Sequence, residues 1–347
     1  MKTETRQQLD NLAAETARLN GVSDVSKKFS LVPEVEQLLV EKQTESVDFL
    51  GKINVVAVEG MTGQKVGLGM GEPLASRTDT QVEERETTDL STLDATGYQC
   101  VQTNFDSHIN YAKLDAWARA GNLPAMYRRA VVKRMALDRI MTAWHGKHAA
   151  KTTNRTQFPL LQDVNVGWLE AVRKERPTQI MGYSSDGAPD GEAYRLGEGG
   201  NWRNLDALVF DLASTLLDPW FVGGDDLVVL LGRELWVYHG LKQYDTNILA
   251  GDKDKLVTWM ATQTVGGLPA LMPPFLPDRA VVVTSLDNLS LYYQFGAVRR
   301  AMIDNPRKDR VEEYMSSNDA YVVEDMGKFA SLRPEALKLK NEAGEWY

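Results

Sequence analysis

Residues 266–325 constrain the fold of this chain more than any other stretch, because strand patterns and turn signals alternate along it. A proline-punctuated turn opens the stretch, segments of alternating apolar and polar residues follow, and a charged segment crosses between them. Such alternation predicts β-strands. None of the side chains here forms a recognisable catalytic set. This part of the chain therefore gives no sign of an active site.

The composition indicates a globular protein with two or three core-bearing units. The chain has 347 residues, of which 43% are hydrophobic and 25% are charged, values within the ordinary globular range. Its single cysteine, Cys100, excludes an intrachain disulfide and fits a reducing cytoplasm. The N-terminal residues lack the apolar core of a signal peptide, and apolar runs such as 227–231 are far shorter than the ~20 residues that span a bilayer. We therefore expect a soluble protein without membrane contact.

Hydrophobic periodicity predicts both helices and strands. Helical spacing occurs over residues 3–19, 33–49, 124–145, 161–176, 204–216 and 233–264. Strand patterns occur over residues 53–58, 66–68, 98–111 and 227–231. Because the polar connection at 71–95 is too long for an ordinary hairpin turn, we expect residues 52–111 to form a long two-stranded excursion with a polar tip.

The helix predicted over residues 124–145 is long, at roughly 33 Å for ~1.5 Å per residue. Pro124 is a good first-turn residue, and Gly146 supplies its end. Its spacing predicts an apolar face formed by Met126, Ala130, Leu137, Met141 and Trp144, with Arg128, Arg129 and Arg139 pointing elsewhere.

Charge is distributed unevenly along the chain. The net charge of −9 argues against sequence-independent wrapping of DNA, which needs a strongly basic surface. Residues 72–94 carry seven acids and two bases, whereas residues 113–151 carry nine bases and two acids. This asymmetry is the one electrostatic feature of the sequence that suggests a mechanism.

Motifs for chemistry are weak. His145 and His148 have a spacing that can place two imidazoles on one helix face, but no third ligand lies nearby in sequence, and a solvated helix end is the simpler interpretation. The glycine-rich run at 63–71 lacks the Lys-Ser/Thr of a phosphate-binding loop and is followed by no helix. Cys100 lies in a strand pattern and is interpreted as a small packed hydrophobe. We expect no catalytic residue, no cofactor and no metal.

Eleven short segments, in order and spacing, resemble one protein family across nearly the whole chain. They are VSKKF at 25–29, DFL at 48–50, KINVVAV at 52–58, TDT at 78–80, LDAWAR at 114–119, LQDVNVGWL at 161–169, NLDALVFD at 204–211, DLVVLLGR at 226–233, NLSLYY at 288–293, NPRKDRVEEY at 305–314 and DAYVVED at 319–325. Each is weak alone. Together they resemble the major capsid protein of Peduoviridae tailed phages.

The resemblance implies an α+β fold of the Hong Kong 97 type, with an N-terminal arm, an extended β-hairpin loop, a peripheral domain built on a long spine helix, and an axial domain. On this basis we expect residues 266–295 to close the axial domain and residues 299–325 to return to the peripheral sheet. The implied division is an arm at 1–50, an extended loop at 51–112, a peripheral domain at 113–200 with its spine helix at 124–145, an axial domain at 201–298, return strands at 299–325 and a C-terminal segment at 326–347.

The same resemblance implies a structural function without catalysis. The chain would self-assemble as hexamers and pentamers into an icosahedral virion shell around phage double-stranded DNA, within the bacterial host cytoplasm. Implied partners are further copies of the chain, an internal scaffold or maturation protease, a portal protein at one vertex, and packaged DNA through non-specific contact. The alternative is a nanocompartment shell protein of the same fold. An enzyme using scattered carboxylates has no supporting motif.

Two sets of site residues follow from the resemblance. In this fold the extended loop lies across a neighbouring subunit, so Glu83, Glu84 and Glu86 of one copy are expected to face Arg128, Arg129 or Lys133 of the next. The alternatives are that both sets are solvated, or that the bases face packaged DNA. The family also implies proteolytic removal of an N-terminal segment, which we place at Phe29 and Ser30, releasing the first ~29 residues.

Overall fold

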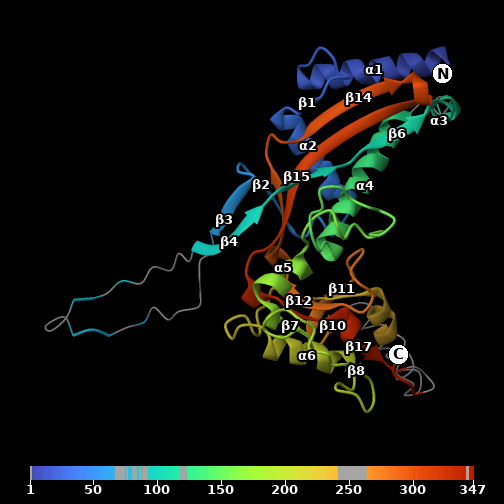
Figure 1. Cartoon of the computed structure of the whole chain (residues 1–347). Coiled ribbons are helices and arrows are strands. Elements are labelled where there is room, and N and C mark those ends of the chain that lie inside the picture. The colour runs from blue at the N-terminus through green and yellow to red at the C-terminus, as the bar shows by residue number, and fades with distance from the viewer. Residues whose placement is uncertain are drawn as a thin grey trace.

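The computed structural model describes residues 2–66, 93–117, 123–240, 264–340 and 344–347, together with positions 75, 77–79, 84, 85 and 87. Its architecture is mixed α+β, with a larger and a smaller β-sheet that lie one beyond the other along the length of an elongated molecule (Figure 1). The described helices are α1 (Thr3–Asn20), α2 (Pro33–Ser46), α3 (Tyr111–Trp117), α4 (Leu123–His145), α5 (Trp168–Glu175) and α6 (Leu205–Thr215), and residues 233–240 are also helical.

Local sequence signals explain where several helices begin and end. α1 ends at Gly21, whose φ of 62° is the left-handed conformation that glycine adopts without steric cost. α2 has proline in its first turn, and the side chain of Asn204 caps α6 by accepting a hydrogen bond from the Ala207 N–H at 2.9 Å. A Cβ on Gly146 would lie 2.3 Å from the Asn165 carbonyl oxygen, so only glycine fits where α4 ends.

The larger sheet is organised around β15 (Arg310–Val323), a strand of 14 residues. Within the described residues this sheet has seven strands, in the order β1-β14-β15-β13-β2, with β5 and β6 also paired to β15. The other members are β1 (Phe29–Ser30), β2 (Asn54–Val58), β5 (Val101–Asn104), β6 (Ser107–Asn110), β13 (Leu289–Gln294) and β14 (Arg299–Asn305). β2 joins the sheet by parallel pairing to β13.

The smaller sheet has the order β10-β11-β9-β12-β16-β7. Its strands are β7 (Ile180–Met181), β9 (Leu227–Leu231), β10 (Thr264–Val265), β11 (Leu268–Leu271), β12 (Val281–Ser285) and β16 (Ala330–Leu332). Nearly all of β9 and all of β12 are buried, as expected for central strands covered on both faces. α6 packs here with Leu208 and Leu212 fully buried.

Two further strand pairs complete the described fold. β8 (Tyr194–Leu196) runs parallel to β17 (Leu337–Leu339) beside the smaller sheet. β3 (Thr62–Val66) runs antiparallel to β4 (Leu93–Gln99) at the side of the larger sheet, with a register shift between Gln64 and Val66. Residues 67–92, apart from the isolated positions named above, lie outside the described structure.

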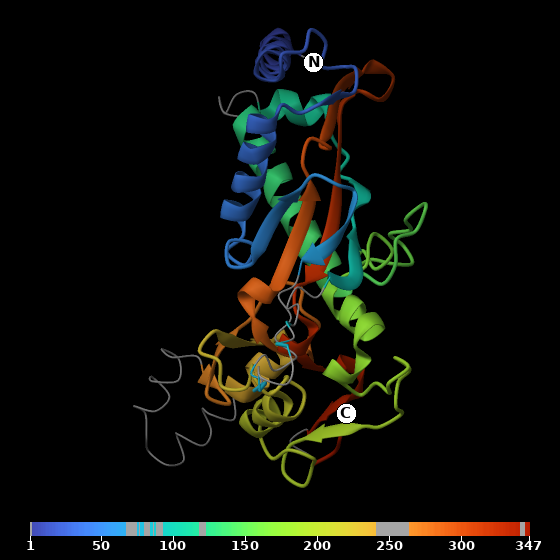
Figure 2. The same ribbon diagram turned by 90° about the vertical axis from the view of Figure 1, so that its left-hand side faces the viewer.

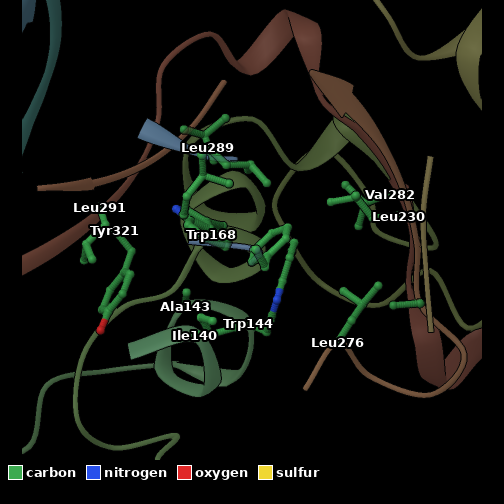
Figure 3. Close-up of a cluster of buried hydrophobic side chains, with 14 of the residues drawn as sticks. Ile140, Ala143, Trp144, Trp168, Leu230, Leu276, Val282, Leu289, Leu291 and Tyr321 are labelled. Atoms are coloured by element: carbon green, nitrogen blue, oxygen red, sulfur yellow. The ribbon is translucent and has the colours of Figure 1, made fainter. Parts of the chain in front are cut away.

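One aromatic core joins the two sheets (Figure 3). Trp168 is 1% exposed, and its ring meets that of Trp144 edge to face, with centroids 4.8 Å apart. Its indole N–H donates to the Ser290 carbonyl at 3.0 Å, which satisfies the polar edge of a buried tryptophan. Leu291 comes to this cluster from the larger sheet and Leu230 from the smaller, so the two sheets share a continuous core.

The structure corrects four expectations about local structure. The helix predicted over 161–176 begins only at Trp168. Leu161 has a φ of 59°, which is not a right-handed helical conformation, and the buried Asn165 side chain donates a hydrogen bond to the Asp319 carbonyl. The pattern at 98–111 is divided into β4, β5 and β6, and its last residue starts α3. Only residues 233–240 of the predicted 233–264 helix are described, and they are helical.

Strand pairing accounts for the other two corrections. β2 pairs with β13 and not with β3, so the two-stranded excursion predicted from residue 52 is a β3–β4 pair. β13 lies in the larger sheet beside β15, although the sequence placed residues up to 298 in the axial unit. The chain crosses between the sheets at 286–288, a turn of 3-10 helix, and it crosses back after Val323 so that β16 and β17 join the smaller unit.

Candidate assembly surfaces

A buried ion pair fixes α4 to the larger sheet. The Arg139 guanidinium donates from Nε and Nη2 to the two carboxylate oxygens of Asp319, each at 2.9 Å, and the two side chains are 3% and 0% exposed. The same guanidinium bonds Ser317 and, from Nη1, the Gln43 side chain of α2. The sequence predicted that Arg139 points away from the core, and this was wrong because α2 and β15 enclose that side of α4.

A groove of about 770 Å³ runs between α1, α2 and α4. Its floor is apolar, and Leu19 and Leu38 in it are 44% and 52% exposed. Three of the predicted site residues, Arg128, Arg129 and Lys133, line one side of it. The groove is therefore an apolar surface with a basic rim.

The three bases differ in their surroundings. Arg128 is half-exposed and forms an ion pair with Glu15 of α1 at 3.6 Å. Arg129 and Lys133 are exposed, and the structure gives neither an ion pair among the residues it describes. Their charges are thus available to a carboxylate from outside the chain.

The acidic partners fall mostly outside the described structure. Glu84 is described and exposed, whereas Glu83 and Glu86 lie among the residues that are not described. Glu84 makes no ion pair to Arg128, Arg129 or Lys133 within the part of this chain that is described.

The predicted processing residues lie in an edge strand. Phe29 and Ser30 form β1, which pairs with Arg300 and Arg299 of β14. Phe29 is half-buried and Ser30 is exposed. The preceding residues 26–28 form an exposed turn. A protease that binds its substrate as an extended strand would have to separate β1 from β14 first.

α1 is held against the body by polar and apolar contacts. The Asp115 carboxylate accepts from the Lys2 backbone N–H at 2.8 Å and from the Thr5 hydroxyl at 2.7 Å, and Arg6 pairs with Asp304 at 2.5 Å. Leu9 packs against Ile109, Leu114 and Val311. The helix that precedes the predicted cleavage position is therefore docked onto the far end of β14 and β15 (Figure 1).

The smaller unit carries large exposed apolar side chains that the sequence analysis did not single out. Phe210 of α6 is 68% exposed, and Trp220 and Met272 are 49% and 50% exposed. Val222 and Val237 are also exposed. The signal for Phe210 was present in the sequence, because it falls on the polar side of a helix whose buried side is Leu205, Leu208, Val209 and Leu212. Exposed apolar side chains of this size are candidates for an interaction surface where they lie together in a patch.

The residues considered for chemistry have ordinary structural surroundings. The Nε2–H of His145 donates to the Phe275 carbonyl at 2.8 Å, and burial lowers the pKa of this imidazole. The His148 ring is exposed and lies edge-on to Phe158 at 5.7 Å. Cys100 is fully buried, and this burial raises the pKa of its thiol to about 11. A thiol with that pKa is a poor nucleophile near neutral pH.

The described ranges show neither a metal-binding cluster nor a membrane-spanning helix. Among those residues, no group of three or more His, Cys, Asp or Glu side chains is arranged to hold a metal ion. No helix in the same ranges combines the length and the hydropathy needed to cross a bilayer.

Comparison with known proteins shows what family this architecture belongs to. The sequence matches the family described as "Phage major capsid protein, P2 family" over residues 8–333. It is 41% identical over 335 residues to the protein "Capsid proteins" of Escherichia phage P2, covering 94% of this chain and 92% of the relative. It is 36% identical over 342 residues to the "Major capsid protein" of Serratia phage KSP20, covering 96% and 97% of the two chains.

A solved structure agrees with the sequence relatives. A chain of "Satellite phage P4 procapsid including size determination (Sid) protein" superposes with a TM-score of 0.78 at 38% identity, covering 98% of this chain and 99% of that one. The fold is therefore the α+β Hong Kong 97-type capsid fold that the resemblance implied, and the nanocompartment alternative is the weaker one. This chain belongs to the P2 family of phage major capsid proteins, and it is a structural component of a tailed-phage virion shell.

Proposed function

We propose that this capsid protein forms hexamers and pentamers through its smaller unit, and that these close an icosahedral shell around double-stranded DNA. The observation that carries the proposal is the exposed apolar set Phe210, Trp220 and Met272, all within the unit that we assign as the axial domain. Rings of identical subunits bury a surface of one copy against a different surface of the next. Apolar side chains of this size stabilise such contacts when water is excluded from them.

Electron microscopy of the purified full-length protein tests this function. Wild-type protein is expected to show closed shells or capsomers, and a protein that stays monomeric at all concentrations would contradict the proposal. Phe210→Asp is expected to abolish rings and shells without changing the urea midpoint of the subunit, because Phe210 contributes little to the subunit core. Phe210→Leu is the matched control and should assemble.

We assign domain roles from the two sheets together with the expected division of the chain. The larger sheet with α4 forms the peripheral domain, and the smaller sheet with α6 forms the axial domain. The β3–β4 pair forms the base of the extended loop, and residues 1–50 form the arm. The shared aromatic core supports the view that the two domains move little relative to each other within a subunit.

We assign the basic rim of the α1–α2–α4 groove as the contact for the acidic loop of a neighbouring copy. Arg129 and Lys133 are exposed, and Glu84 is exposed on the loop side. Each exposed pair contributes only about 0–1 kcal/mol, but a shell repeats the same contact in every copy. The floor of the groove adds apolar contact, which a purely electrostatic interaction would lack.

We also assign proteolytic removal of residues up to Phe29 during maturation, by a protease that acts with or as the internal scaffold. The exposed turn at 26–28 beside β1 supports access to this position once the edge strand is released. Intact-mass measurement of chain isolated from virions tests the assignment. A mass beginning at Ser30 supports it, and a full-length mature chain excludes it.

The remaining partners follow from the role of a shell. The subunit assembles in the cytoplasm of the bacterial host, meets a portal protein at one vertex, and encloses DNA through contacts that do not depend on sequence. The family is structural, and we propose that the chain has no catalytic activity of its own. The raised pKa of the Cys100 thiol and the bonded imidazole of His145 support this view.

A further inference from the structure

A second basic surface lies on the other side of α4 from the groove. The loop that follows α4 projects on the side away from α2, with α4 between them, in both views of the molecule (Figures 1 and 2). Residues 151–157 are all exposed, and they read Lys-Thr-Thr-Asn-Arg-Thr-Gln. Every one of these side chains carries a hydrogen-bond donor, and none is acidic.

The absence of acid extends well beyond these seven residues. Residues 140–162 contain three Lys or Arg and no Asp or Glu, in a chain whose net charge is −9. Lys147, Lys151 and Arg155 of this segment are exposed. A run of this kind in an acidic protein concentrates positive potential at one place.

Two carboxylates near the loop, Asp138 and Glu170, are already paired with other bases. Asp138, which lines the same hollow as Arg155, pairs with Arg134. Glu170, which lines the same hollow as Lys147, pairs with Arg173 at 2.6 Å and with Lys174 at 3.4 Å. Asp106 lines the hollow of Arg155 and Glu335 lines that of Lys147, and the structure gives neither an ion pair among the residues it describes.

The loop is held in one conformation by its own hydrogen bonds. The buried Asp163 carboxylate accepts from the Asn154 backbone N–H at 2.6 Å, and the Asn154 side-chain oxygen accepts from the N–H groups of Thr156 and Gln157 at 3.0 and 3.2 Å. The Lys147 N–H donates to the Gln162 carbonyl at 2.8 Å. Because the backbone is already ordered, binding through the side-chain donors of this loop loses little backbone conformational entropy.

We propose that residues 147–157 form the surface through which the shell contacts the phosphate backbone of the double-stranded DNA that it encloses. Phosphate oxygens are bound by Lys, Arg, Thr, Asn and Gln side chains, which is the composition of this loop. Contacts to phosphate oxygens carry no direct sequence information, so the proposed binding does not depend on base sequence. The inference rests on the proposed enclosure of DNA and deepens it by naming the contacting surface.

An acidic loop from a second copy is the competing occupant of a basic surface. The groove rim formed by Arg129 and Lys133 has the apolar floor that a protein segment would use. Residues 151–157 include no apolar side chain. A fully polar, donor-rich surface suits a solvated polyanion better than it suits a protein interface, whose centre is depleted of charged groups.

Salt-dependent binding of duplex DNA tests the proposal. The full-length chain, at concentrations where sedimentation detects no shells, is titrated into a fluorescent duplex of about 30 base pairs between ~50 and ~200 mM NaCl. The test variant is Lys147→Gln, Lys151→Gln, Arg155→Gln, and the matched control removes the same charge at the exposed Lys27, Lys28 and Arg203. Three lost phosphate contacts should reduce the slope of log affinity against log salt by about 2.7, at about 0.9 per phosphate.

Each outcome decides between the alternatives. A reduced slope in the test variant and an unchanged slope in the control support the proposal, and the single change Lys151→Gln should then account for about 0.9 of the reduction. Equal slopes in all proteins, or equal loss in test and control, overturn it. A test variant that is folded by circular dichroism but forms no shells assigns the loop to a subunit interface and also overturns it. Shell formation by the variant, seen by microscopy, keeps the proposed function intact in either case.

Discussion

The Lys65 ammonium group donates a hydrogen bond to the Val323 carbonyl at 2.8 Å. Lys65 lies in β3, which we propose as the base of the extended loop, and Val323 is the last residue of β15 in the larger sheet. The side chain is 6% exposed, and its nitrogen also lies 3.7 Å from a carboxylate oxygen of Glu175 in α5. One buried lysine thus ties the loop base to both the sheet and the short helix.

Replacing this lysine should loosen the loop base. Lys65→Met keeps the length of the side chain and leaves the Val323 carbonyl without this donor, so we expect a loss of about 1–3 kcal/mol in the free energy of unfolding. Urea denaturation followed by tryptophan fluorescence measures it. Lys52→Met is the control, because Lys52 pairs with Asp48 at an exposed site and should cost at most about 1 kcal/mol. Equal losses in the two variants would contradict the assigned role.

Removing one partner of the buried pair of Arg139 and Asp319 should lower the free energy of unfolding far more than Lys65→Met does. Asp319→Ala leaves a guanidinium that is 3% exposed without its carboxylate, and we expect a loss of about 3–5 kcal/mol. The exposed pair of Arg134 and Asp138 on the same helix provides the comparison, and Arg134→Ala should change stability by at most about 1 kcal/mol. Differential scanning calorimetry of the unassembled subunits distinguishes these expectations. A small effect of Asp319→Ala would mean that water enters the site.

Glu36 should make subunit stability depend on pH in a direction opposite to that of a carboxylate whose pKa is lowered, such as Glu312. It is fully buried between α2 and the β13–β14 turn, where one carboxylate oxygen accepts from the Gly296 N–H at 2.8 Å and the other has no hydrogen-bond partner. Burial raises the pKa of Glu36, and the Gly296 N–H and the Arg139 charge offset this only in part. Its contribution to stability is therefore present below the ordinary glutamate pKa and is lost as pH rises through the raised value.

The variant Glu36→Gln tests this sign. At pH 8 the variant should have a higher urea midpoint than wild type, because it buries no charge, and the difference should shrink toward pH 4.5, near the ordinary pKa of a glutamate. Glu312 is the counter-example within the chain, because hydrogen bonds from Tyr314 and Arg310 lower its pKa to about 2. A wild-type advantage that grows with rising pH would refute the assignment.

A charge exchange tests the proposed contact between loop and spine helix. Reversing Glu83, Glu84 and Glu86 to Lys should impair shell assembly or make it more sensitive to salt, since each copy would then present like charges to Arg129 and Lys133. Combining that change with Arg129→Glu and Lys133→Glu should restore assembly. Light scattering across a range of NaCl concentrations measures both. Normal assembly of the triple variant at every salt concentration would exclude the contact.

Local signals in the sequence were sufficient for most helices and for the buried strand at 227–231. Helical spacing, a capping Asn204 and prolines in first turns are all encoded within a few residues, so the elements that they set could be predicted. The failed helix start at 161 has a different cause. The Asn165 side chain donates a hydrogen bond to a carbonyl 154 positions later in the chain, and a pattern of neighbouring residues cannot predict that contact.

The interaction surfaces were only partly predictable for the same reason. Arg128, Arg129 and Lys133 were identified from charge, which is a local property, although the groove that they border is built from three helices. The burial of Arg139 could not be foreseen, because it depends on Asp319 and Gln43 approaching from different elements. Met126 was expected on the apolar face of its helix and is 58% exposed, so helical spacing alone did not identify which turns of that face are buried.

The parallel pairing of β2 with β13 has a consequence for how the subunit is made. Val58 pairs with Gln294, so this edge of the larger sheet cannot form until Gln294 has been synthesised. The two positions are 294 − 58 = 236 residues apart, a length that takes roughly 12–47 s to synthesise at about 5–20 residues per second. During that time β2 has no β13 to pair with, so this edge of the larger sheet can form only after β13 has been synthesised.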